Sequence, residues 1–411
     1  MKDEEMPHLS INGERLISSI REMGAVGFDP ETGGRTRLAL TDSDKEGRDL
    51  LCSWMREEGL DVKIDPIGNI FGVREGTSPS QLPLIMGSHI DTVRDAGMFD
   101  GAYGVLGGLE VIRTLNENNV RTNKPLAVAA FTNEEGARFQ PDMMGSLYYT
   151  GTVGLEKLLS AKDDIGLTVG EELDRIGYRG KETVRAGCYI ELHIEQGPRL
   201  HAAGLPIGVV EGIQGLAWWT GEYFGESNHA GSTPMDMRKD ALLAAAELAI
   251  EAEKLALRLG KGSVSTMGRI YPKPDIINIV PGKCSFTLDF RQFERGLFEE
   301  GKKQIESLMN ACAEKRGLKC EFRKSAEAPP VVFDSEMAGL VETTASLLGL
   351  DSERMISGAS HDAQFLSPFC PSVMIFVPSA GGRSHCPEEW TDPEDLENGC
   401  NVLLRSVLKL V

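Results

Sequence analysis

Residues 82–93 read Leu-Pro-Leu-Ile-Met-Gly-Ser-His-Ile-Asp-Thr-Val, a short apolar run that ends in a histidine and a carboxylate. The run predicts a buried strand, because it is short, apolar and bounded by Pro and Gly. Its carboxyl end would bring His89 to the edge where open α/β sheets place their sites. A lone histidine there is more often a core or loop residue than a ligand. Asp91 favours a ligand, since a metal-bound histidine donates its second ring N–H to an outer carboxylate, and Asp91 is close enough in sequence to be that partner.

Asp100 precedes a glycine-rich segment that has the periodicity of a helix. The apolar residues at helical spacing are Val105, Leu106, Leu109, Ile112 and Leu115. An aspartate before a helix is normally its N-cap, which is one interpretation of Asp100. The glycines of the first turn permit a close backbone approach at a crowded site, so a metal-bridging carboxylate is the other interpretation.

Residues 125–131 form a second apolar run, which continues directly into Thr-Asn-Glu-Glu at positions 132–135. This run predicts another buried strand of the parallel type. Adjacent carboxylates in a loop are usually only solvated. Metal-assisted hydrolysis, however, needs one carboxylate as a ligand and a neighbour that moves protons. We therefore interpret Glu135 as a ligand and Glu134 as the base.

Two more histidines follow strand-like segments. Residues 188–198 alternate apolar and polar side chains, so His193 lies on the polar face of a predicted strand. The other members of that face are Tyr189, Glu191 and Glu195. Residues 371–378 form an apolar run that leads into a glycine-rich loop carrying His385. Each segment alone is a weak signal, but together they place histidines and carboxylates at the exits of successive strands.

The chain carries, in order, the motifs MGSHIDTV, GMFDGAYGVLGGLE, TNEEGARF, ELHIEQGP, NHAGSTPM, NIVPGKCSFTLDFR, SGASHDA and GRSHCPEE. With these motifs it resembles the carbamoylase and allantoate-amidohydrolase branch of the M20 metallopeptidase-like family, from about Ile11 to the C-terminus. The resemblance implies an α/β fold with two domains. One is a mixed-sheet hydrolase domain with a dinuclear metal centre, and the other is an inserted ferredoxin-like α+β domain that serves as lid and dimerisation domain.

The resemblance also implies a role for each residue of the metal centre. One ion would be held by His89 and His193 and the other by Glu135 and His385, with Asp100 bridging both and Glu134 as general base. Ligands of this mixed kind accept zinc, manganese, cobalt or nickel, so we expect two such divalent ions per subunit. Peptidases of the wider family typically have a carboxylate where this chain has His193, which separates it from them.

A second group of residues is expected to bind the substrate. His229 lies in a turn-rich segment and is either an ordinary loop histidine or, as the resemblance implies, a lid residue that completes a neighbouring subunit's active site. We expect it to donate a hydrogen bond to a tetrahedral oxyanion. Asn278 and Arg291 lie near opposite ends of a strand-like run, and the two together are expected to grip a substrate carboxylate. The alternative for Arg291 is a surface salt bridge.

Two residues beside the expected metal centre complete this group. Gln196 either adds an amide contact near the ions or closes a turn before Gly197. Gly381 belongs to the glycine-rich loop 381–384, which we expect to line the substrate pocket.

A change in the order of the predicted strands and helices indicates where the domains begin and end. Strands and helices alternate up to about residue 212, beginning with an amphipathic helix near residues 11–23. The order then becomes strand-helix-strand-strand-helix-strand, which is typical of a ferredoxin-like domain. Its expected elements are a strand ending at Phe224, a helix over 238–259, strands near 263–270 and 278–290, a helix over 295–315 and a strand near 318–323. We expect a discontinuous catalytic domain of residues 1–212 and 329–411, and a lid of residues 213–328.

Composition excludes several other classes of protein. The 43 basic and 62 acidic residues give a formal net charge of −19, which argues against nucleic acid and anionic membrane surfaces as partners. No stretch approaches the ~20 apolar residues that span a bilayer. The eight cysteines are scattered without a C-x-x-C pair, and the N-terminal residues lack an apolar signal core. We therefore expect a cytoplasmic protein.

The resemblance implies hydrolysis of an N-carbamoyl-L-amino acid to the amino acid, ammonia and carbon dioxide. Two divalent ions that share a carboxylate lower the pKa of a bound water toward ~7 and so supply the attacking group at neutral pH. Allantoate amidohydrolase is the close alternative, because it shares the ligands and the base. An aminoacylase or dipeptidase is a third interpretation, weakened by His193. A metal-stabilised binding protein or inactive relative is the fourth, although no ligand is missing. We also expect a homodimer formed through the lid.

Overall fold

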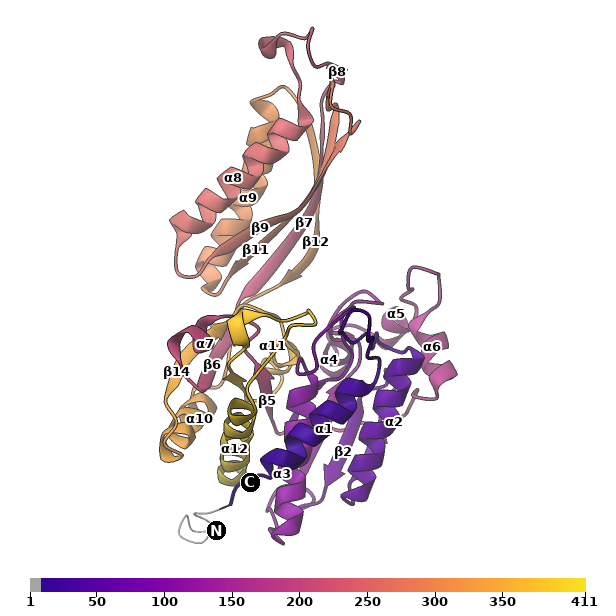
Figure 1. Ribbon diagram of the computed structural model, residues 1–411, viewed down its shortest axis with the longest axis vertical. Coiled ribbons are helices and arrows are strands. Elements are labelled where there is room, and N and C mark those ends of the chain that lie inside the picture. Colours follow the sequence, from indigo (N-terminus) through magenta and orange to yellow (C-terminus); the bar gives the residue numbers. More distant parts are fainter. Residues whose placement is uncertain (1–8) are drawn as a thin grey trace. The chain divides into compact units, whose positions relative to one another are not determined.

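The computed structural model describes residues 9–411, which divide into two compact units (Figure 1). The first unit comprises the chain up to Glu211 together with Val332–Val411. The second unit is Gly212–Val331, so it is an insertion into the first. The chain thus has the two-domain α/β architecture that its sequence predicts.

A nine-stranded mixed sheet forms the centre of the first unit. Its order is β1-β2-β4-β3-β5-β15-β6-β13, and β14 pairs with β6 outside that path. The strands are β1 Asp61–Ile64, β2 Ile70–Arg74, β3 Leu84–His89, β4 Leu126–Phe131, β5 Cys188–Ile194, β6 Ile207–Ile213, β13 Val331–Val332, β14 Ser352–Ser357 and β15 Ser372–Val377. Strands β4, β3, β5 and β15 run parallel. The apolar runs that predicted β3 and β4 are buried along their whole length, as central parallel strands are.

Helices cover this sheet on both faces. The longer ones are α1 Gly13–Ala25, α2 Asp42–Glu57, α3 Ala102–Glu117, α10 Ser335–Leu347 and α12 Pro393–Leu410. The shorter ones are α4 Met144–Tyr149, α5 Leu155–Leu159, α6 Val169–Ile176, α7 Arg199–Ala203 and α11 Asp362–Leu366. Helix α3 packs against Leu192 of β5, where a Cβ at Gly104 would lie 2.3 Å from the Leu192 carbonyl oxygen. Glu191 points to the opposite face, where it accepts a hydrogen bond from the backbone of Ala363 in α11.

The second unit is a four-stranded antiparallel sheet with two helices on one face (Figure 1). Its elements in chain order are β7 Gly215–Phe224, α8 Ala241–Leu259, β9 Val264–Lys273, β11 Lys283–Gln292, α9 Arg295–Glu314 and β12 Lys319–Ala328. The strand order is β12-β7-β11-β9. The predicted ferredoxin-like order of strands and helices is therefore confirmed.

The predicted strand over residues 278–290 is interrupted, and this part of the prediction is wrong. The chain forms a short β10, Ile279–Val280, and then β11 from Lys283. Pro281 cannot donate to a ladder, and Gly282 is packed so closely that a Cβ would lie 2.5 Å from the Ser227 nitrogen. β10 pairs instead with β8, Asn228–His229, in a separate two-stranded ladder.

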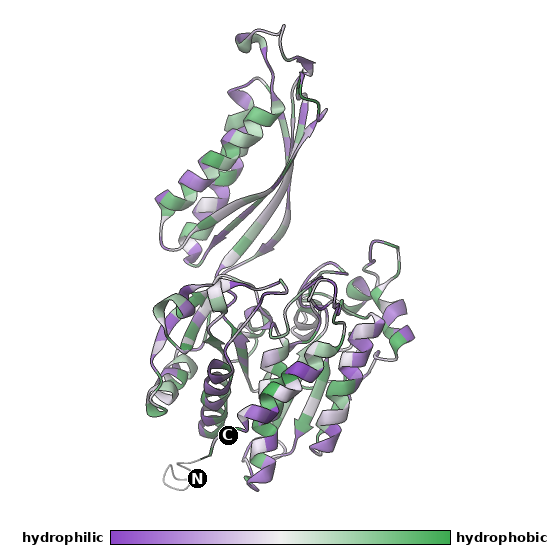
Figure 2. Cartoon of the chain, viewed as in Figure 1, coloured by the Kyte–Doolittle hydropathy of each residue, from purple (hydrophilic) through white to green (hydrophobic). Residues whose placement is uncertain are grey.

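The core of the second unit lies between its sheet and its helices. It includes Trp219, Tyr223, Phe286, Phe290 and Phe298. Helix α8 is hydrophobic along much of its length (Figure 2), including residues that face away from this core. Among the described residues, no helix of either unit is both long and apolar enough to cross a membrane.

Candidate metal centre

The polar residues singled out in the first unit meet at one edge of its sheet. Strand β3 ends at His89, β5 carries His193 one residue before its end, and the segment after β4 holds Glu134 and Glu135. The loop after β15 holds His385. Because these four strands are parallel, their carboxyl ends lie at the same edge, which is where such sheets form their sites.

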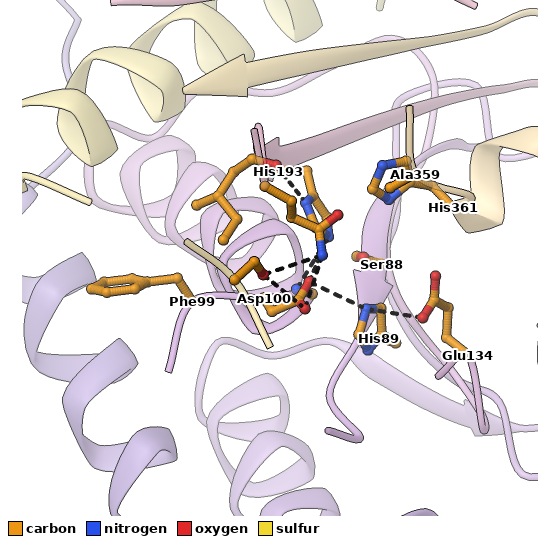
Figure 3. Close-up of polar contacts among 12 residues, drawn as sticks. Ser88, His89, Phe99, Asp100, Glu134, His193, Ala359 and His361 are labelled. Atoms are coloured by element: carbon orange, nitrogen blue, oxygen red, sulfur yellow. Dashed lines mark hydrogen bonds and ion pairs between the residues drawn. The ribbon is translucent and has the colours of Figure 1, made fainter. Parts of the chain in front are cut away.

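Asp100 stands between these residues and faces them with both carboxylate oxygens (Figure 3). Its Oδ1 lies 3.3 Å from His193 Nε2 and 4.0 Å from His89 Nε2. Its Oδ2 lies 2.9 Å from His385 Nε2. One carboxylate therefore serves two groups of potential ligands, one on each side.

The capping interpretation of Asp100 is wrong. Helix α3 has Gly101 as its N-cap, with φ of 63° and no side-chain capping hydrogen bond. A Cβ on Gly101 would lie 2.4 Å from His89 Nε2, so glycine allows the helix to begin against the histidine ring. The tight turn leaves the Asp100 carboxylate directed at the histidines rather than at the helix backbone.

Four groups of three side chains in the described part of the chain could hold a metal ion, and two of these triads share Asp100. They are His89, Asp100 and His193, and Asp100, Glu135 and His385. In each triad the ligand atoms lie within 4.8 Å of one another. In the second, His385 Nε2 is 3.4 Å from Glu135 Oε2. This is the geometry of two cation sites that share one carboxylate.

The histidine rings are oriented as metal ligands are. Nδ1 of His89 lies 2.9 Å from the backbone oxygen of Asp91, and Nδ1 of His193 lies 2.8 Å from that of Ile194. If each Nδ1 donates its proton there, each Nε2 presents a lone pair to the Asp100 side. Burial lowers the pKa of His89 to about 4, which keeps this imidazole neutral.

Asp91 is an outer partner of the site, but not in the expected way. Its carboxylate lies 3.9 Å from His89 Nδ1, so the backbone carbonyl and not the side chain takes the ring N–H. The carboxylate instead accepts hydrogen bonds from the backbone nitrogens of Glu134 at 3.2 Å and Glu135 at 3.4 Å. Asp91 therefore ties the segment after β3 to the segment after β4.

The donor set fits divalent cations, on three observations. Burial, with repulsion from neighbouring carboxylates, raises the pKa values of Glu134 and Glu135 well above their usual range. In the described part of the chain, Glu135 Oε1 and Gln196 Oε1 are buried without a hydrogen-bond partner. The hydrogen bond with Asp100 also raises the pKa of His385 to about 9, so this position favours positive charge. A cation in each triad would relieve both the repulsion and the unsatisfied oxygens.

Glu134 and Glu135 point to different partners although they are adjacent in sequence. Glu134 Oε2 lies 3.4 Å from His89 Nε2, and its side chain is almost fully buried. Glu135 faces His385 on the other side of the site. The two carboxylates still approach each other, because ligand atoms of His89, Glu134 and Glu135 lie within 4.8 Å of one another and form a further potential ligand group.

Gln196 contacts the shared carboxylate. Its Nε2 donates to Asp100 Oδ2 at 3.0 Å and lies 3.3 Å from Ser384 Oγ and from His385 Nε2. Gly381 lies in the loop before His385, in a short helical turn, Ala380–Gly382, and has φ of 63°. The amide-contact interpretation of Gln196 is thus the one that the geometry supports.

Sequence reasoning missed two buried residues of this site. The His361 ring centroid lies 4.5 Å from that of His193, and its Nε2 is 3.1 Å from Ser357 Oγ (Figure 3). Glu191 accepts from Ser88 Oγ at 2.7 Å and forms a third potential ligand group with His193 and His361. The alternation of residues 188–198 already placed Glu191 on the face of His193, so that signal was present. His361 belongs to the motif SGASHDA, but neither the periodicity nor the spacing of that segment indicates a site residue.

The three expected substrate residues of the second unit fall into two places. His229 and Asn278 lie together, because β8 and β10 pair and the Ala230 nitrogen donates to the Asn278 oxygen at 2.9 Å. Nδ1 of the exposed His229 accepts from the backbone of Gly231 at 3.0 Å, which leaves its Nε2–H as a donor. Arg291 is near the far end of β11 and pairs with Asp289 at 3.0 Å.

Arg291 lies eight residue steps along the extended strand β11 from Lys283, which is next to the β8–β10 ladder, a distance of ~26 Å at about 3.3 Å per residue. Arg291 and Asn278 of one chain therefore cannot close on the same carboxylate. The expectation that this pair grips one carboxylate is wrong for a single chain.

A buried histidine and carboxylate centre at the carboxyl ends of the parallel strands of a mixed sheet, in a domain interrupted by a ferredoxin-like insertion, defines a hydrolase of the metal-dependent α/β class. Peptidase family M20/M25/M40 matches residues 85–409, and the chain belongs to this family. It is 40% identical over 407 residues to N-carbamoyl-L-amino acid amidohydrolase of Geobacillus stearothermophilus, covering 97% of this chain and 99% of that protein.

Two further similarities narrow the branch of the family. An amidase of the hydantoinase/carbamoylase family from Burkholderia multivorans has a crystal structure that matches with a TM-score of 0.93 and 40% identity, covering 98% of each chain. Allantoate amidohydrolase of Bacillus subtilis is 33% identical over 390 residues, covering 92% of this chain and 93% of that protein. The protein is a member of the hydantoinase/carbamoylase amidase branch, a hydrolase acting on non-peptide C–N bonds.

Proposed function

We propose that the protein hydrolyses the ureido C–N bond of N-carbamoyl-L-amino acids and releases the amino acid, ammonia and carbon dioxide. The observation that carries the proposal is the Asp100 carboxylate, shared between two histidine-containing triads with Glu134 beside one of them. The similarity to an N-carbamoyl-L-amino acid amidohydrolase at 40% identity supports this choice of substrate.

Each subunit would hold two divalent ions, which are zinc, manganese, cobalt or nickel. The first would be bound by His89 and His193 and the second by Glu135 and His385, with Asp100 shared. When bound, the ions lower the pKa of water and polarise a carbonyl oxygen. The Nε2 atoms of His89 and His193, which both face Asp100, and the buried Glu135 oxygen without a hydrogen-bond partner support this assignment.

The protein's own groups would move the protons and stabilise the charge. Glu134 accepts the proton of the attacking water at its carboxylate and passes it to the leaving nitrogen. Burial raises the pKa of Glu134 from its usual value toward the pH at which the enzyme works. A carboxylate with such a pKa can both accept and release a proton during the reaction. Nε2–H of His229 donates to the oxyanion that forms at the ureido carbon. Gln196 and Gly381 would contact the substrate beside the ions.

The substrate carboxylate would be bound by residues of two chains. Because Arg291 and Asn278 of one chain are far apart, we propose that Arg291 acts with His229 and Asn278 of a partner chain. Helix α8 supports a homodimer through the lid, since Leu243, Ile250 and Leu257 recur every seven residues on its exposed side. The adjoining edge strand β9 also exposes Val264 and Ile270.

Mixed dimers test whether His229 acts across the interface. His229→Ala alone is expected to lower kcat by about 10²–10³-fold, the usual effect of losing one oxyanion donor. A dimer purified with one His229→Ala chain and one Glu134→Gln chain is expected to recover about half of wild-type activity, because one of its two equivalent sites is intact. The measurement is ammonia release by dimers that carry two different affinity tags.

The control is each variant purified as a homodimer, and both should be nearly inactive. If the mixed dimer is as inactive as the homodimers, His229 serves its own chain or neither chain. A monomeric protein at assay concentration would contradict the dimer itself.

Allantoate hydrolysis is the second candidate, because a relative named for that activity is similar over almost the whole chain. The two activities share the ligands and the base, and differ in the pocket around residues 358–362 and 381–384. An aminoacylase or dipeptidase activity is a more distant third. The expected cytoplasmic location also stays a proposal, in keeping with eight cysteines that are all free thiols.

A substrate panel separates these candidates. The metal-reconstituted enzyme is assayed with N-carbamoyl-L-amino acids, allantoate, N-acyl amino acids and dipeptides, with ammonia and free amine as readouts. We expect the highest kcat/KM with an N-carbamoyl-L-amino acid. Ammonia from allantoate alone would replace the first candidate with the second, and amine release from acyl amino acids or dipeptides alone would exclude both.

A further inference from the structure

The carboxylate of Glu389 lies behind the metal centre and joins two of its segments. Its Oε1 accepts hydrogen bonds from the backbone nitrogens of Phe99 at 3.0 Å and Asp100 at 3.2 Å. Its Oε2 accepts from Ser384 Oγ at 2.8 Å, one residue before His385. The side chain is buried, with 3% of the residue exposed. One side chain thus holds the turn of Asp100 and the loop of His385 together.

The surroundings keep Glu389 in this position. A Cβ on Gly97 would lie 2.2 Å from Glu389 Oε1, so only glycine leaves room for the carboxylate there. The next residue, Trp390, packs its ring edge-on against Phe99, with centroids 5.8 Å apart. Gly97 and Phe99, which belong to the short segment before Asp100, therefore pack against Glu389 and Trp390 respectively.

Glu389 repeats the arrangement found at Asp91. Each is a buried carboxylate that accepts hydrogen bonds from two successive backbone nitrogens of a ligand-bearing segment. Asp91 ties the segment after β3 to Glu134 and Glu135. Glu389 ties the turn of Asp100 to the loop after β15.

The loop of His385 is held before Ser384 by the packing of Gly382 against Pro198 and by the hydrogen bond from the Ala380 nitrogen to the Trp390 oxygen. The His385 side chain is 47% exposed. Its backbone has a φ of 56°, a conformation that residues other than glycine rarely adopt. Its neighbour Ser384 is fixed by Glu389 and contacts Gln196. Loss of the Glu389 link would therefore leave His385 free to move away from Asp100.

We infer that Glu389 is a positioning residue that holds the His385 loop against the Asp100 turn and thereby sets the affinity of the Asp100, Glu135 and His385 triad for its cation. The inference rests on the proposed function for the assignment of that triad as a metal site. It adds a residue that touches neither ion nor substrate. It also predicts a larger effect on the ion of this triad than on the other, because Glu389 fixes both Asp100 and the loop of His385, whereas the other triad shares only Asp100 with it.

The test measures zinc binding to the full-length protein after chelation, by equilibrium dialysis and metal analysis. Glu389→Ala is expected to retain one tightly bound ion and to bind the second about 10- to 100-fold more weakly, the usual effect of losing an outer partner. Glu389→Gln is expected to stay close to wild type, since its amide oxygen accepts both N–H groups and its NH₂ donates to Ser384. Glu388→Ala is the matched control, because it removes the same charge from an exposed neighbour.

Thermal unfolding of the metal-free proteins shows whether Glu389→Ala folds. If it does not, Ser384→Ala removes the loop half of the link, and a selective weakening of the second ion is again expected. Two ions bound as tightly as in wild type, or equal weakening of both ions, would overturn the inference. If the wild-type protein itself binds fewer than two ions, the metal assignment fails, and this inference fails with it. The wild-type titration therefore distinguishes the two failures.

Discussion

Glu134→Gln is expected to lower kcat by about 10²–10⁴-fold while the protein keeps both metal ions. Glutamine has the same shape as glutamate but cannot accept a proton at neutral pH. Glu134 also forms a potential ligand group with His89 and Glu135, but it belongs to neither triad that shares Asp100, so its change to glutamine should leave those two ligand sets intact. The backbone of residue 134 stays held by the Asp91 carboxylate, which preserves the local geometry.

The measurements are ammonia release at saturating substrate and metal content after dialysis. Glu135→Gln is the comparison, because it changes the adjacent residue in the same way but is expected to weaken the ion shared with His385. A Glu134→Gln enzyme with near-normal turnover would remove Glu134 as the base. A variant that loses an ion would instead make Glu134 a ligand.

Asp100→Asn is expected to abolish measurable turnover and to weaken both ions. Asp100 supplies an oxygen to each triad and is the one residue that the two triads share. The amide keeps the shape but loses the charge that offsets two dications. The loss of affinity should exceed the 10- to 100-fold that follows loss of an outer partner, because a shared ligand is removed.

Metal titration followed by thermal unfolding checks this prediction. Wild-type protein should gain stability as metal is added, since a ligand that binds the folded state stabilises it by mass action. Asp100→Asn should gain much less, whereas Asp164→Asn, an exposed control in a loop, should behave as wild type. An Asp100→Asn protein that binds two ions with unchanged affinity would rule out the shared carboxylate.

Much of the fold could be predicted because its signals are local. The apolar runs of β3 and β4 identify central parallel strands, since strands buried on both faces need apolar residues at every position. The order of elements in the second unit follows from helical and strand periodicity alone. The prediction failed at Pro281 and Gly282, where two separate ladders replace one strand.

The site was less predictable because its geometry depends on partners distant in the chain. The bond from the Phe99 nitrogen to Glu389 spans 290 residues, and no periodicity indicates such a pair. Asp91 was identified from its spacing to His89, but sequence could not distinguish its carboxylate from its backbone carbonyl. The capping interpretation of Asp100 failed for the same reason, since the His89 ring in tertiary contact with Gly101 shapes the helix start.

The sequence by itself determined which residue types stand at the ends of the buried strands, because hydrophobic periodicity marks those ends. Only the tertiary structure decided how these residues face one another. Two oxygens of Asp100 meet histidines from β3, β5 and the loop after β15, and that convergence comes from parallel pairing between strands far apart in the chain. Likewise, the length of β11 from Lys283 to Arg291 keeps Arg291 far from Asn278, because an extended strand has a fixed rise per residue.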